Sequence, residues 1–112
     1  MQTVIQGRKV DHDERKDGIL AMLGDKYCRT IIAVTMDKPK SALEISSETK
    51  IPVSTVYRRL QFLFDNKILR ISGSINGDGK KNFLYKSRIK AISTTFNGSF
   101  VEVEIVPNNR IA

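Results

Sequence analysis

One stretch near the middle of the sequence concentrates side chains that can recognise a nucleic acid. If the residues after Pro52 form a helix, one arc of it consists of Val53, Ser54, Tyr57, Arg58 and Gln61. A guanidinium and an amide can hydrogen-bond to base edges in the DNA major groove, and an apolar side chain can touch a thymine methyl. The arc is therefore typical of a helix that reads double-stranded DNA, with the edge of a core as an equal alternative for Tyr57.

Other polar residues suit contacts with phosphate better than contacts with bases. Thr55 and Arg59 lie at the flanks of the same helix, where phosphate contacts are favoured. Further along, the segment 73–81 is rich in glycine and asparagine and ends in Lys80 and Lys81. Such a loop can contact backbone phosphate or reach into a minor groove. The alternative is an ordinary hairpin with two solvated lysines.

The positive charge of the chain is confined to one region. The net charge is +7, and the segment from Lys50 to Lys90 holds ten basic residues against two acidic ones. This segment alone therefore carries +8, and the rest of the chain sums to −1. Such asymmetry indicates a surface that binds a polyanion. On charge alone, a basic face that serves solubility fits equally well.

No group of residues predicts catalysis or metal binding. The chain has one cysteine, Cys28, and one histidine, His12, which are too few for a thiolate or imidazole site. The acidic run from Asp11 to Glu14 is typical of a solvated helix start. Ser54 and Thr55 have no histidine in their helix to activate them. We therefore expect a protein that is not an enzyme, with no metal and no cofactor, and a Cys28 that is buried as a small hydrophobe.

Composition limits the chain to one ordinary domain. The 112 residues are 40% hydrophobic and 28% charged, as in soluble globular domains. A single cysteine excludes an internal disulfide. No apolar run approaches the roughly 20 residues of a membrane span, and the polar N-terminus lacks a signal-peptide core. We expect a cytoplasmic protein with no membrane association.

The pattern upstream of residue 67 predicts helices. Capping signals begin them: Asp11 with Glu14 (or else Asp17), Asp25, and the pair Ser41 and Glu44. Pro39 should end the helix that precedes it, and Pro52 suits the first turn of a helix over about 52–66. We expect the core-facing residues of the last two helices to be Leu43, Ile45, Val56, Leu60, Leu63 and Phe64.

Downstream of residue 67 the pattern predicts two β-hairpins. Ile68, Leu69 and Ile71 form a strand, a loop spans 73–79, and a second strand holds Phe83 and Tyr85. Residues 89–96 and 100–106 form the second hairpin across Asn97-Gly98, a dipeptide that favours tight turns. A two-residue turn places Ile92 opposite Val103 and Thr94 opposite Val101.

These elements together predict an α+β fold, a winged helix-turn-helix. It has three to four helices, a β-hairpin wing at 73–81 and an additional C-terminal β-hairpin. We divide the chain into an N-terminal arm (1–10), the winged helix-turn-helix domain (11–87), and the C-terminal β-hairpin (88–107). The last belongs to the same domain or to a dimer interface.

The stretch from Ile45 to Leu60, above all the run STVYRRL at 54–60, resembles ArsR-like winged-helix transcriptional regulators of the archaeal type. The resemblance implies dimeric binding to double-stranded DNA and control of transcription. The sequence identifies no small-molecule effector. Two residues depart from the family pattern: Ser46 stands where alanine is common, and Lys50 where glycine is common at the turn. A left-handed Lys50 would cost on the order of 1 kcal/mol. The lack of cysteine and histidine clusters argues against metal sensing.

The sequence thus favours a sequence-specific DNA-binding transcriptional regulator that acts as a homodimer. The N-terminal arm, the first helix and the hairpin at 89–106 motivate the dimer, because one short recognition helix rarely gives high specificity. Two alternatives remain. One is a winged-helix module that binds proteins, and the other is a nonspecific chromatin-type or single-strand binder.

Overall fold

A computed structural model describes residues 7–75 and 81–108, apart from the side chains of residues 74, 75 and 81. The helices are α1 (Asp13–Leu23), α2 (Lys26–Val34), α3 (Ala42–Thr49) and α4 (Val53–Asp65). The strands are β1 (Arg8–Lys9), β2 (Leu69–Ile75), β3 (Lys81–Ser87), β4 (Ile89–Phe96) and β5 (Val101–Pro107). The predicted α+β winged helix-turn-helix with an additional C-terminal hairpin is confirmed.

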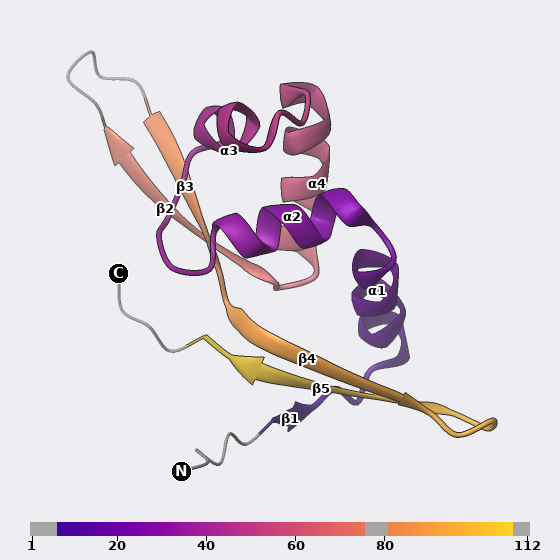
Figure 1. The fold of residues 1–112 in the computed structure, drawn as a ribbon. Helices are drawn as coiled ribbons and strands as arrows, with labels where there is room; N and C mark the ends of the chain where they lie inside the picture. The colour runs from indigo at the N-terminus through magenta and orange to yellow at the C-terminus, as the bar shows by residue number, and fades with distance from the viewer. Residues whose placement is uncertain (1–6, 76–80, 109–112) are drawn as a thin grey trace, which may run out of the picture.

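The strands form two separate antiparallel sheets. β2 pairs with β3 to make the wing hairpin, and β5 lies between β1 and β4 in a three-stranded sheet. The two hairpins extend in different directions from the helices (Figure 1). A single residue, Arg88, separates β3 from β4, so the two sheets meet at that point. An isolated bridge between Lys40 and Tyr85 ties the segment before α3 to the wing.

Local capping signals set the helix starts in two of the three predicted places. Ser41 accepts a hydrogen bond from the Glu44 backbone N–H at 3.1 Å, and Glu44 accepts one from the Ser41 N–H at 3.0 Å, which completes a capping box. Asp25 caps α2 by accepting from the Cys28 N–H at 3.3 Å. The predicted cap by Asp11 is wrong: α1 begins after His12, and no side chain bonds its free N–H groups.

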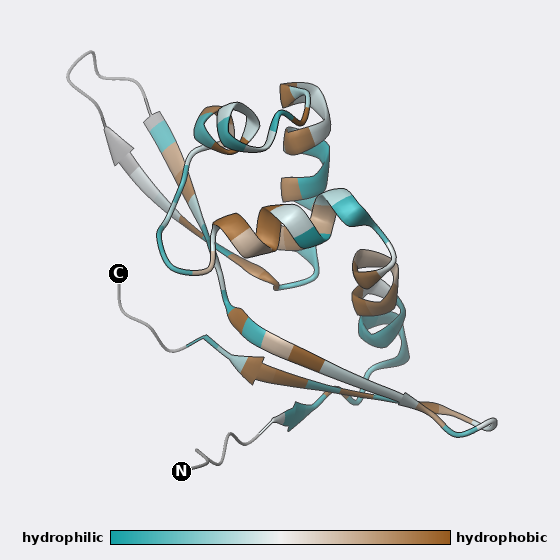
Figure 2. Ribbon diagram, viewed as in Figure 1, coloured by the Kyte–Doolittle hydropathy of each residue, from teal (hydrophilic) through white to brown (hydrophobic). Residues whose placement is uncertain are grey.

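The core lies between the helices and the base of both hairpins. Helices that bury one face show alternating brown and teal residues along α2 and α4 in Figure 2. The largest fully buried side chains include Ile19, Met22, Ile31, Ile45, Leu60, Leu63 and Ile68. The predicted burial of Cys28 is confirmed, since 1% of that residue is exposed.

Two residues predicted to face the core do not. Leu43 is 66% exposed and Phe64 is 43% exposed. In α3 the buried face passes through Ala42 and Ile45, and Leu43 lies one position to the side. In α4 the flank that holds Arg59 and Phe62 is partly covered and the flank that holds Phe64 is open. The buried arc is therefore rotated toward α2 relative to the prediction.

The C-terminal hairpin has a longer turn than predicted. Asn97 accepts hydrogen bonds from the backbone N–H groups of Ser99 (2.9 Å) and Phe100 (3.1 Å), and Gly98 has φ +94°. These bonds fix a four-residue turn in place of a two-residue one. The register is therefore Ile92 opposite Ile105 and Thr94 opposite Val103. A shift of two leaves every side chain on the predicted face but changes its partner.

The wing strands are longer than the sequence indicates. β2 continues to Ile75, so the predicted loop start at Gly73 is wrong, and Gly73 pairs with Phe83 inside the hairpin.

No helix in the described ranges 7–75 and 81–108 is long and apolar enough to cross a membrane.

Candidate nucleic-acid interface

The turn between α3 and α4 sets the direction of the recognition helix. Lys50 ends α3 in the left-handed conformation, with φ 65°, as its position at the turn suggested. The Ser46 hydroxyl donates to the Ile51 carbonyl at 2.6 Å. Thr49 donates to the Ile45 carbonyl at 2.7 Å and accepts from the Ile51 N–H at 3.3 Å. Two hydroxyls thus stabilise the turn. Ser46 forms a hydrogen bond to the Ile51 carbonyl that alanine could not form.

α4 presents a polar and partly apolar face to solvent. The buried side of the helix is made by Val56, Leu60 and Leu63. On the other side, all five residues of the predicted arc are exposed: Val53 (38%), Ser54, Tyr57 (52%), Arg58 and Gln61. The exposure of Tyr57 decides against its placement at the core edge. Thr55 is half-buried at the flank of the helix.

Arg58 and Gln61 differ in how freely their polar groups can meet a ligand. Within the described part of the chain, Arg58 forms no hydrogen bond and no ion pair. Gln61 donates to the Asp65 carboxylate at 2.8 Å across one turn of the exposed surface. That bond is solvent-exposed and therefore weak, and it leaves the amide oxygen of Gln61 available.

Arg59 is engaged with its own protein. Its Nε lies 2.6 Å from Oδ2 of Asp25, and its guanidinium lies 5.7 Å from the centre of the Tyr27 ring. The hydrogen bond to Asp25 raises the pKa of Arg59. Arg59 therefore joins α4 to the start of α2, and a phosphate that approaches this flank competes with a carboxylate already in place.

Exposed cations lie at both ends of α4. Lys50 is exposed at the turn that leads into the helix, beside the predicted arc. Lys67, Arg70 and Arg88 are exposed around the other end of α4 and the base of the wing. The path of the chain after α4 brings Lys67, Arg70 and Arg88 to the same place, and no local sequence pattern predicts that path.

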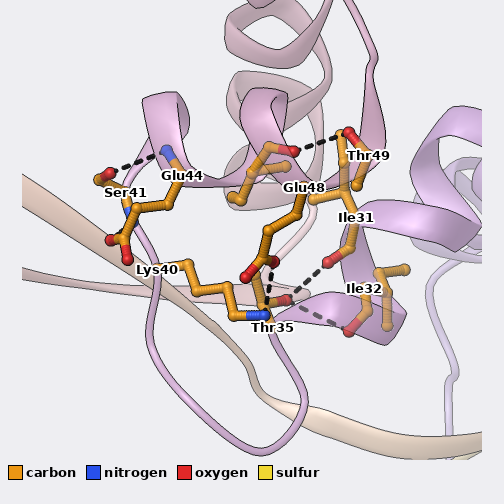
Figure 3. A network of polar contacts seen from close by, with 9 residues as sticks. Ile31, Ile32, Thr35, Lys40, Ser41, Glu44, Glu48 and Thr49 are labelled. Carbon is orange, nitrogen blue, oxygen red and sulfur yellow. Dashed lines mark hydrogen bonds and ion pairs between the residues drawn. The ribbon is translucent and has the colours of Figure 1, made fainter.

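Polar contacts join α3 to the segment that precedes it (Figure 3), and backbone hydrogen bonds join that segment to the wing. The Lys40 ammonium lies 2.7 Å from Glu48 of α3, and the Lys40 backbone exchanges two hydrogen bonds with Tyr85 of β3, at 3.0 and 2.8 Å. Thr35, fully buried, donates to the Ile31 carbonyl at 2.8 Å. Of the predicted wing cations, Lys81 begins β3, and Lys80 lies outside the described residues.

The chemistry of Cys28 follows from its environment. Burial, helped by a hydrogen bond with Asp25, raises the pKa of the Cys28 thiol to about 12. The side chain is therefore a protonated thiol at neutral pH and a poor nucleophile. Among residues 7–75 and 81–108, no group of three or more histidine, cysteine, aspartate or glutamate residues could hold a metal ion.

Comparison with known proteins supports the architecture. No family model matches the chain, and no curated protein matches it. A solved structure from Methanosarcina mazei Go1, described as a possible transcriptional regulator, has a similar fold. The two chains are 21% identical with a TM-score of 0.53, and the alignment covers 73% of this chain and 75% of the other. Similarity at this level shows a shared fold.

Proposed function

We propose that this protein is a sequence-specific, double-stranded DNA-binding transcriptional regulator. The observation that supports the proposal most is the exposed arc of α4, with Arg58 free of partners in the described part of the chain. In this proposal the recognition helix, about residues 52–66, enters the major groove. Arg58 and Gln61 hydrogen-bond to base edges, and Val53 and Tyr57 contact apolar surface.

Phosphate contacts complete the proposed interface. Thr55, at the flank of α4, contacts backbone phosphate, and Ser54 adds a hydroxyl to the arc that faces the groove. On sequence position and charge, Lys80 and Lys81 contact backbone phosphate or a minor groove from the wing. Arg59 contributes long-range attraction more than a direct contact, because Asp25 holds its guanidinium.

A regulatory role as a homodimer is the finer part of the proposal. The neighbour from Methanosarcina mazei is described as a possible transcriptional regulator, and the run at 54–60 resembles ArsR-like regulators of the archaeal type. A homodimer would present two copies of α4 to half-sites about 34 Å apart. The C-terminal hairpin, which carries the exposed Phe96 and Phe100, is the element we assign to the dimer interface.

Substitution of Arg58 tests the proposal. Arg58→Ala is expected to weaken binding to the best duplex by about 1–3 kcal/mol, a loss of roughly 5- to 150-fold, and to relax preference at one or two base pairs. The matched control is Arg29→Ala, which removes the same charge from an exposed position of α2. Fluorescence anisotropy with labelled duplexes measures both variants.

The outcomes separate this proposal from its rivals. Equal, small losses in both variants would indicate a nonspecific binder that senses net charge alone. No DNA binding by the unaltered protein would favour the winged-helix module that binds a protein partner. Only a selective loss in Arg58→Ala supports a base-reading role.

A further inference from the structure

A second concentration of positive charge lies at the C-terminal end of α4, away from the turn between α3 and α4. A groove of about 300 Å³ is lined by five cationic residues: Arg8, Lys9, Arg15, Lys67 and Arg88. A neighbouring groove of about 470 Å³ shares Arg8 and Arg88 and adds Arg70. Among the described residues, no carboxylate lines either groove. We call the pair the basal groove.

Backbone pairing brings these cations together from distant parts of the sequence. The Arg88 N–H donates to the Ile68 carbonyl at 2.8 Å, which places Arg88 beside the end of α4. The Arg88 carbonyl accepts from the Asn108 N–H at 2.9 Å, and Arg8 pairs with Ile105 in the sheet. The groove thus gathers cations from β1, α1, β2, the segment after α4 and the link between β3 and β4, and backbone hydrogen bonds hold Arg8 and Arg88 in this arrangement.

The backbone at Lys67 is unusual for a lysine. Lys67 has φ 61°, and its N–H bonds to the Phe64 carbonyl while the Ile68 N–H bonds to the Leu63 carbonyl, both at 2.9 Å. This arrangement is a Schellman motif, in which glycine is the preferred residue at the left-handed position. A lysine there costs conformational energy that glycine would avoid. Position 67 therefore carries a lysine although the backbone conformation there favours glycine.

Within residues 7–75 and 81–108, the cations of the basal groove form no ion pair. The Nε of Arg15 is buried and has no hydrogen-bond partner. Arg15 and Lys67 also border an adjacent groove that contains Asp13, Glu14 and Asp65, yet none of these carboxylates forms an ion pair with either cation. A buried donor without a partner carries a desolvation cost, which a bound anion would offset.

The groove also has an apolar side. Ile89, Ile105 and Pro107 line it together with the cations. Several guanidinium and ammonium groups next to apolar surface suit a ligand with multiple negative charges on a compact, partly apolar body. Arginine forks match phosphate oxygens well.

We propose that the basal groove binds a small molecule that carries two or more phosphate groups. The site lies at the C-terminal end of α4, about 10 Å of helix rise beyond Arg58 at 1.5 Å per residue. It is thus separate from the arc around Arg58, and the inference does not depend on DNA binding. Duplex DNA is the other source of closely spaced phosphates, and the test distinguishes the two.

Calorimetric titration of the full chain with inorganic tripolyphosphate, at physiological salt, tests the proposal. We expect saturable binding of one ligand per chain. Arg15→Gln and Arg88→Gln should each weaken it about tenfold or more, because each removes a charged hydrogen-bond donor. Arg29→Gln makes the same charge change at an exposed position of α2, and it should change the affinity for tripolyphosphate less than about twofold. Circular dichroism checks that each variant is folded.

Lys67→Gly removes one cation of the basal groove without destabilising the fold, because glycine is favoured at this left-handed position. Glycine suits the left-handed position, so the midpoint of thermal unfolding should rise while tripolyphosphate binding weakens. Absence of saturable binding, or an equal loss in Arg29→Gln, would overturn the proposal. It would also be overturned if tripolyphosphate does not bind while Arg88→Gln weakens binding to duplex DNA, since the groove would then belong to a DNA surface.

Discussion

At the scale of single residues, Asp25 joins two parts of the fold. Its carboxylate caps α2 through the Cys28 N–H and holds Arg59 of α4 at 2.6 Å. Burial acts to raise the pKa of Asp25, but hydrogen bonds from Cys28 and Arg59, together with the charge of Arg59, lower it below the ordinary value of 3.8. The charged carboxylate is thus the form that stabilises the fold.

This lowered pKa predicts a specific acid sensitivity. A carboxyl whose pKa is lower in the folded state stabilises the protein fully above its unfolded pKa, and that contribution is lost as the pH falls toward the folded pKa. The difference in unfolding free energy between the unaltered protein and Asp25→Asn should be constant between about pH 7 and pH 5 and shrink below about pH 4. Urea denaturation across this range measures it.

An exposed carboxylate serves as the control for this measurement. Asp17 lies on the exposed side of α1, and Asp17→Asn should not reproduce the pH-dependent difference. A gap between the unaltered protein and Asp25→Asn that stays constant down to pH 2.5, roughly, would contradict the assignment.

Single-residue roles could be predicted where they depend on near neighbours. The capping role of Asp25 and the burial of Cys28 follow from residues within one turn. The ion pair with Arg59 spans 34 positions, and no local pattern indicates it. The sequence therefore favours a phosphate contact for Arg59, whereas in the fold the Asp25 carboxylate already holds its guanidinium.

At the scale of elements, the capping box determines where the helix-turn-helix begins. Ser41 is 9% exposed, and its hydroxyl accepts from the Glu44 N–H while Glu44 accepts from the Ser41 N–H. The backbone N–H of Ser41, together with its hydroxyl, holds the pKa of Glu44 below its ordinary value. Both ends of the box are therefore in use.

Removal of the cap should weaken the fold by a measurable amount. Ser41→Ala is expected to lower the free energy of unfolding by about 1 kcal/mol, because the Glu44 N–H loses its acceptor. Ser47→Ala, at an exposed position of the same helix, should cause no loss because alanine favours helix. Urea denaturation of the two variants at neutral pH gives the comparison. Equal stability of the two would show that the capping box does not stabilise α3.

Element types could be predicted further than element details. Proline and capping signals place α3 and α4 because they act within a few residues. The four-residue turn of the C-terminal hairpin depends on side-chain bonds from Asn97, which compete with the two-residue turn that Asn-Gly favours. The exposure of Phe64 depends on which flank of α4 meets α2, a tertiary choice that periodicity alone does not make.

At the scale of the whole molecule, the excess charge serves two places. Lys50 and Arg58 lie on the side of the helix-turn-helix, and Lys67, Arg70 and Arg88 lie at the base, where the sheets meet. The sequence predicts a basic region from residue 50 to 90. The number of charged residues along the chain cannot show that they divide between two surfaces, one on the exposed arc of α4 and one at its C-terminal end. The order of helices and strands along the chain is predictable from the sequence, but the division of positive charge between two surfaces is not.

The central claim is that α4 reads a DNA sequence. Selection of bound duplexes from a random pool, followed by sequencing, tests it most directly. We predict an enriched short motif, repeated with twofold symmetry in half-sites about 10 base pairs apart as a homodimer requires. Arg58→Ala should lose preference at one or two positions of each half-site. A bound pool with no enriched motif would contradict the claim.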